Sequence, residues 1–112
     1  MIELRDYLVR RPDSINDCGA ETWRVIGTNL SLVRLQYKAR SDRRTQLLTK
    51  EWYFILRGRP TMIIDGEVLN LHIGMMVTVI PGQIHQMVNH THEDVLFMVE
   101  KNIKWDTDQK PH

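Results

Sequence analysis

Residues 51–89 constrain the fold more than any other part of the sequence, because short apolar segments alternate there with turn-forming residues. Asp65-Gly66 separates the segments TMII and EVLNL, and this dipeptide suits a two-residue type I′ hairpin, in which both turn residues have positive φ. Pro81-Gly82 ends the next apolar segment, MMVTVI. The stretch therefore predicts a series of short strands that turn back on one another.

The segment 30–40 predicts a further, half-buried strand, because apolar and polar side chains alternate along it. Its expected apolar face consists of Val33, Leu35, Tyr37 and Ala39.

The remaining segments extend the all-β pattern. Residues 22–27 and 94–102 each predict a short strand, whereas residues 2–10 fit either an edge strand or a short helix. Many short strands in 112 residues, with turn residues between them, predict a small all-β barrel or sandwich with one interior pocket.

The length predicts a single domain over residues 1–112. Its core is expected to span about residues 24–104, with an N-terminal strand or loop arm over 1–23 and a polar tail over 105–112. Hydrophobic residues make up 42% of the sequence and charged residues 26%, which is typical of a globular domain in water.

Charge and cysteine content indicate the expected cellular compartment and binding partners. The formal net charge of +1 offers no general attraction to nucleic acid or to an acidic membrane. Cys18 is the only cysteine, which excludes an intrachain disulfide and fits a reducing compartment. No apolar stretch has the length of a signal peptide or a membrane span. We therefore expect a cytoplasmic protein that binds neither nucleic acid nor membrane.

The second half of the stretch resembles the second sequence motif of the cupin superfamily. That motif is a glycine, five residues, a proline, one residue, a glycine, two residues, a histidine, three residues and an asparagine. Gly74, Gly82, His85 and Asn89 occupy these positions. Only the proline of the motif is replaced, by Ile80.

The end of the first cupin motif, a glutamate followed after six residues by a glycine, matches Glu51 and Gly58. The resemblance covers roughly residues 30–100. It implies an all-β, jelly-roll-like barrel, the small double-stranded β-helix of cupins.

The sequence departs from the metal-binding members of that family. These usually carry two histidines, one residue apart, shortly before the glutamate. The corresponding positions here are Thr45 and Leu47 or, with one more residue of spacing, Arg44 and Gln46. Of the usual four ligands only Glu51 and His85 remain, so the resemblance implies either no cofactor or a weakly held divalent transition metal on these two residues.

Glu51 and His85 are also the candidates for catalysis. A carboxylate is costly to bury without a partner, and a histidine changes its charge near neutral pH. If the two meet inside the barrel they form an acid/base pair; alternatively, an arginine satisfies the carboxylate and the barrel wall satisfies the imidazole. Candidate substrate-binding residues are Tyr53, Arg44, Gln46 and Met87.

Other residues are assigned less specific roles. Asn89 is expected to tie a strand end to a neighbouring turn. Trp52 and Phe54 lie on the strand face opposite Glu51, where they would pack at a subunit or sheet interface, and we therefore expect a homodimer. His90 and His92 are expected in a solvated turn.

Three functions remain compatible with these observations. The first is binding of a polar small molecule (a sugar, sugar phosphate or organic acid) in the barrel, with acid/base chemistry by Glu51 and His85 and no tightly bound metal. The second is a metal-dependent dioxygenase, isomerase or lyase with an incomplete ligand set. The third is a non-enzymatic sensor or interaction module. The sequence leaves open whether the protein is an enzyme.

Overall fold

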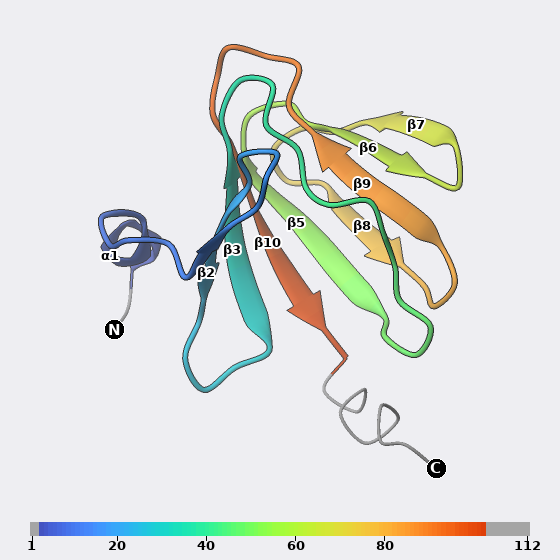
Figure 1. Ribbon diagram of the computed structural model, residues 1–112, viewed down its shortest axis with the longest axis horizontal. Coiled ribbons are helices and arrows are strands. Elements are labelled where there is room, and N and C mark those ends of the chain that lie inside the picture. The colour runs from blue at the N-terminus through green and yellow to red at the C-terminus, as the bar shows by residue number, and fades with distance from the viewer. Residues whose placement is uncertain (1–2, 103–112) are drawn as a thin grey trace.

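Two antiparallel β-sheets form the protein in a computed structural model that describes residues 3–102, which confirms the predicted all-β class (Figure 1). The six-stranded sheet has the order β1-β2-β3-β10-β5-β8, and the four-stranded sheet has the order β4-β9-β6-β7. The elements are α1 (Leu4–Leu8), β1 (Ser14–Ile15), β2 (Glu21–Arg24), β3 (Leu30–Leu35), β4 (Arg44–Thr45), β5 (Glu51–Arg57), β6 (Thr61–Ile64), β7 (Glu67–Asn70), β8 (Met76–Val79), β9 (Ile84–Val88) and β10 (Val95–Lys101).

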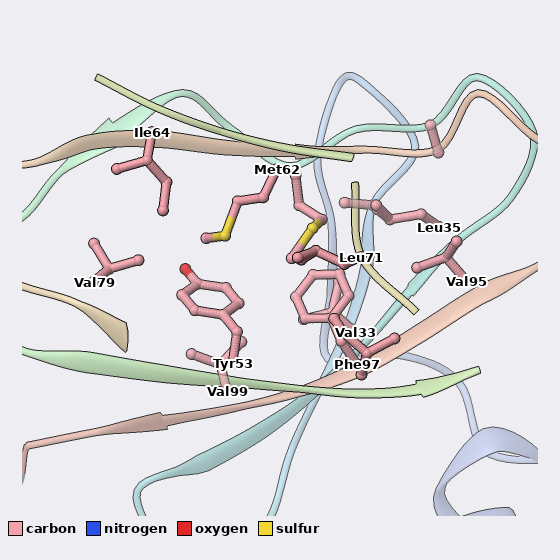
Figure 2. Packing of buried hydrophobic residues seen from close by; sticks show 14 residues of the cluster. Val33, Leu35, Tyr53, Met62, Ile64, Leu71, Val79, Val95, Phe97 and Val99 are labelled. Carbon is pink, nitrogen blue, oxygen red and sulfur yellow. The ribbon is translucent and has the colours of Figure 1, made fainter. Parts of the chain in front are cut away.

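The hydrophobic core lies between the facing sheets. Figure 2 shows Tyr53 and Val99 projecting from the six-stranded sheet towards Met62 and Ile64 of the other sheet. Burial alternates along β5, so that its odd-numbered residues from Glu51 to Ile55 face this interior. Among the described residues, no helix is long and apolar enough to cross a membrane.

The turns follow the predicted chemistry where glycine was expected to matter. Asp65 and Gly66 have φ values of 49° and 81°, which confirms the tight hairpin between β6 and β7. Gly58, after β5, has a φ of 82°, and a Cβ atom added there would lie 2.7 Å from the carbonyl oxygen of Asp94. Only glycine combines this backbone conformation with so close a neighbour.

The structure decides the conformation of the N-terminal residues and corrects the strand predicted over 30–40. Leu4–Leu8 form a helix, and its Tyr7 is buried with Trp23 on the outer face of the six-stranded sheet. The strand predicted over 30–40 ends at Leu35, because the chain turns and Lys38 has a φ of 68°. Tyr37 was predicted to be in the apolar face, but it is 45% exposed and its ring stacks on His92.

The outer face of β5 carries the aromatic residues that were assigned to an interface. Trp52 and Phe54 are half-buried there, and the homodimer stays a prediction. The polar tail expected over 105–112 lies outside the described residues.

Candidate functional site

A cavity of about 360 Å³ opens between the two sheets. The six-stranded sheet contributes Glu51 and Tyr53 from β5, and the four-stranded sheet contributes His85 from β9 and Arg44 from β4. The size falls in the range of small-molecule sites. The N-terminal arm also lines the cavity, with β1 (Ser14–Ile15) among its walls.

Glu51 and His85 meet directly at this cavity. His85 Nε2 lies 3.0 Å from Glu51 Oε1, and the two side chains are only 4% and 3% exposed. The hydroxyl of Tyr53 donates a hydrogen bond of 3.0 Å to the same carboxylate oxygen. On the other side of the carboxylate, Lys101 Nζ lies 3.9 Å from Oε2. One carboxylate is therefore surrounded by an imidazole, a phenol and an ammonium group.

These neighbours determine the charge state of Glu51. Burial by itself raises the pKa of this carboxyl, but the hydrogen bond and charge of His85, the charge of Lys101 and the hydrogen bond of Tyr53 together lower it below the ordinary value of 4.5. Glu51 is consequently ionised at neutral pH. Burial also raises the pKa of the Tyr53 hydroxyl, and the adjacent Glu51 carboxylate raises it further, so that the phenol keeps its proton.

The His85 ring lies between two hydrogen-bond acceptors. Nδ1 lies 3.3 Å from the carbonyl oxygen of Gln83, while Nε2 faces Glu51. Both neighbours are acceptors when Glu51 is ionised, so the ring satisfies both only if it donates from each nitrogen. His85 is thus placed to donate a hydrogen bond from Nε2 to the Glu51 carboxylate.

The other predicted site residues divide into two groups. Arg44 lines the cavity, and its guanidinium also contacts Asp42 at 3.4 Å. Gln46 does not line the cavity, and its backbone carbonyl accepts a hydrogen bond from the Gly82 N–H. Met87 is 1% exposed and belongs to the hydrophobic core, because its position on β9 faces Met62 of β6.

The residues present do not fit a metal centre of the cupin type. Within residues 3–102, no group of three or more His, Cys, Asp or Glu side chains gathers in a ligand arrangement. Thr45 and Leu47, at two of the positions usually held by histidine, are exposed and do not line the cavity. Glu51 and His85 alone are fewer protein ligands than a structural or catalytic site normally uses.

Asn89 has the structural role that was predicted. Its side-chain amide donates to the carbonyl oxygens of Leu35 and Glu93, and its side-chain oxygen accepts from Thr91. It thereby joins the ends of β3 (Leu30–Leu35) and β9 (Ile84–Val88) to the turn before β10.

Two cationic residues of the site were missed from the sequence. Lys101 and Arg24 both line the cavity, from the last position of β10 and the last position of β2. A period-two pattern could have indicated Lys101, because Val95, Phe97 and Val99 on the same strand are buried and face the interior. Arg40 and Arg43, which lie close to Arg44 in the sequence, do not line the cavity, and Arg40 contacts the Cys18 sulfur.

Comparison with known proteins gives a consistent assignment. A family model described as a cupin domain matches residues 32–100. A cupin 2 conserved barrel domain protein from Salinispora arenicola is 20% identical, with a TM-score of 0.70 and coverage of 97% of this chain and 95% of that one. A search of curated proteins finds no match.

Two further solved structures carry different functional names. A cupin-superfamily sugar phosphate isomerase from Silicibacter pomeroyi is 25% identical, with a TM-score of 0.62; the match covers 65% of this chain but only 48% of that one. CENP-C from Drosophila melanogaster, bound to CAL1, is 11% identical, with a TM-score of 0.67 and coverage of 80% and 78%. The fold, the motif residues and the family match agree, and the chain belongs to the cupin family.

Proposed function

We propose that this protein binds a polar small molecule between its two sheets and that Glu51 and His85 act on it as an acid/base pair. The observation that carries the proposal is the buried contact of 3.0 Å between Glu51 Oε1 and His85 Nε2 at the wall of a cavity. Buried ionisable pairs at a cavity are frequent features of active sites.

The two carboxylate oxygens of Glu51 have different roles in this proposal. Oε1 is held by His85 and Tyr53, whereas Oε2 has no hydrogen bond within the described part of the chain and lies 3.9 Å from Lys101. Oε2 is therefore available to accept a proton from a ligand carbon next to a carbonyl group, or a hydrogen bond from a ligand hydroxyl. The contact of His85 with Oε1 stabilises the ionised carboxylate, so that Glu51 can act as the base.

A sugar, sugar phosphate or hydroxy acid is the ligand class that we favour. Such molecules present several hydroxyl groups, which match the convergent donors and acceptors of Glu51, Tyr53 and Arg44 on the cavity wall. The name of the Silicibacter pomeroyi protein, a sugar phosphate isomerase, supports the same class. The same fold also occurs in CENP-C, whose structure was solved with a protein partner. The ligand class is therefore inferred from the site residues, because fold alone does not decide function.

A melting-temperature screen with sugars, sugar phosphates and hydroxy acids tests binding. A ligand present at 100 times its dissociation constant stabilises the folded state by about 2.7 kcal/mol, a readily measured shift. Glu51→Gln is expected to weaken a hit at least about tenfold, because the loss of a charge-assisted contact costs about 1.4 kcal/mol or more. Glu100→Gln is the matched control, since Glu100 pairs with Trp52 and does not line the cavity.

Acid/base chemistry is tested by incubating each hit with the protein in D₂O and following deuterium incorporation at carbon by NMR. Exchange that is lost in Glu51→Gln and retained in Glu100→Gln supports the proposal. If no ligand binds, or if both variants behave alike, the proposed site is wrong and an interaction module becomes the better interpretation.

Metal content gives an independent prediction. Protein purified without a nickel column is expected to hold less than about a tenth of an equivalent of any transition metal, because only Glu51 and His85 remain from the usual ligand set. Elemental analysis measures this directly, and ligand binding should be unchanged after treatment with EDTA. Stoichiometric metal, lost together with binding in Glu51→Gln, would instead support the metal-dependent alternative.

A further inference from the structure

We propose that Lys101, Arg24 and Ser31 form a binding site for an anionic oxygen group, a carboxylate or a phosphate, at one end of the cavity. The inference rests on the proposed function, because it assigns the charged end of the same ligand. All three residues line the cavity, and they come from three adjacent strands of the six-stranded sheet.

The strand register brings these side chains to one region. Ser31 on β3 pairs with Arg24 of β2 on one side and with Val99 of β10 on the other. Lys101 follows Val99 by two residues, so both face the interior. The Cα atoms of Arg24 and Lys101 are therefore separated by two strand spacings and two residues, roughly 12 Å. Lys101 Nζ lies beside Glu51 of β5, and by turning towards β3 it would meet Arg24 above the shorter Ser31.

The interior becomes more polar towards this end. Phe97 and Val33 pair in the middle of the sheet and are both buried. The next inward-facing pair along the same two strands is Val99 and Ser31, and beyond it comes Lys101. A ligand lying along this wall would place apolar or weakly polar atoms against Phe97 and its most polar group beside Lys101.

The donors of this region are largely uncommitted. Within residues 3–102, the side chains of Arg24 and Ser31 have no hydrogen bond or ion pair. Lys101 Nζ contacts Glu51 at 3.9 Å, which is too long for a hydrogen bond and leaves its three N–H groups available. A guanidinium and a hydroxyl group without partners, beside an ammonium group with free N–H groups, are donors that bind carboxylates and phosphates.

The carboxylates of the cavity determine where the anion can lie. Glu51 contacts His85 and Lys101, and Asp42 contacts Arg44 at 3.4 Å. An anion is therefore repelled least on the side of Lys101 that faces Arg24, across β10 from Glu51. The ligand would then span the cavity, with its hydroxyl groups at Glu51 and its anionic group at Arg24 and Lys101.

The test is an NMR titration of the ¹⁵N-labelled protein with inorganic phosphate, with acetate and with neutral D-ribose at constant ionic strength. Phosphate or acetate should produce saturable shifts of the amide signals around residues 24, 31 and 101. Saturation by phosphate alone assigns a phosphate site, and saturation by acetate assigns a carboxylate site. Lys101→Gln and Arg24→Gln should each raise the dissociation constant of the anion at least about tenfold.

Lys50→Gln is the matched control, because it removes the same charge at the same end of the sheet. Lys50 Nζ lies over the ring of Trp52 on the outer face and does not line the cavity. The anion site is ruled out if neither anion gives saturable shifts, or if Lys101→Gln binds as tightly as Lys50→Gln. Ribose binding without anion binding would overturn the anion site and leave the proposed function standing. Saturable anion binding, together with ligand binding and deuterium exchange that Glu51→Gln leaves unchanged, would support the anion site and overturn the proposed function.

Discussion

Asn89→Ala is expected to lower the free energy of unfolding by about 3–4 kcal/mol. The Asn89 side chain is fully buried and takes part in four hydrogen bonds of 2.7–2.9 Å, with Leu35, Glu93 and Thr91. Each bond contributes about 1 kcal/mol, and truncation also leaves the buried carbonyl oxygen of Leu35 without this donor. The residue thus holds together segments that are far apart in the sequence.

Urea unfolding of the purified variant measures this loss directly. Asn70→Ala is the control, because Asn70 is an exposed asparagine on β7 whose side chain only accepts a bond of 3.4 Å from Thr61. Its stability should change by less than about 0.5 kcal/mol. An Asn89→Ala variant as stable as Asn70→Ala would show that the four bonds contribute little beyond what water provides.

Local sequence signals were sufficient for most of the fold. The Asp65-Gly66 turn needs positive φ at both residues, which few other dipeptides tolerate. These two residues were therefore enough to predict the position of the hairpin. The motif residues Gly74 to Asn89 then indicated how the later strands follow one another. Tyr37 was misplaced because alternation continues in the sequence beyond Leu35, while the backbone turns at Lys38.

The site could be predicted only in part, because its membership depends on pairing between distant strands. Glu51 and His85 were identified as residue types in a recognisable spacing, and the structure brings them within 3.0 Å. Lys101 reaches Glu51 because β10 pairs with β5 in one particular register. A shift of that register by one residue would turn Lys101 to the outer face, and no local pattern fixes the register across fifty residues of chain.

His85→Leu is expected to have the largest effect of any single change in the site, a loss of about 3–5 kcal/mol at neutral pH. The substitution keeps the approximate volume of the side chain but removes the main partner of a buried carboxylate. Glu51 would retain the Tyr53 hydroxyl and a distant Lys101, while burial, which raises its pKa, would no longer be outweighed by His85. The unpaired charge therefore opposes folding.

The pH dependence separates this charge effect from simple loss of packing. In the wild type the pKa of Glu51 is lowered in the folded state, so its contribution to stability is present above 4.5 and disappears as the pH falls through the lower, folded value. In His85→Leu the folded pKa is raised instead, and protonation at acid pH relieves the buried charge. The difference in stability between wild type and variant should consequently shrink between pH 7 and pH 4.

Urea unfolding at pH 7, 5.5 and 4 measures this difference, with His72→Leu as an exposed-histidine control. The double variant Glu51→Gln/His85→Leu should be more stable at pH 7 than His85→Leu alone, because it buries no charge at this position. A loss that is equal at all three pH values, and that the second substitution does not reduce, would mean that His85 acts through packing. The pair would then be a neutral hydrogen bond, and the electrostatic basis for acid/base chemistry in this cupin would be lost.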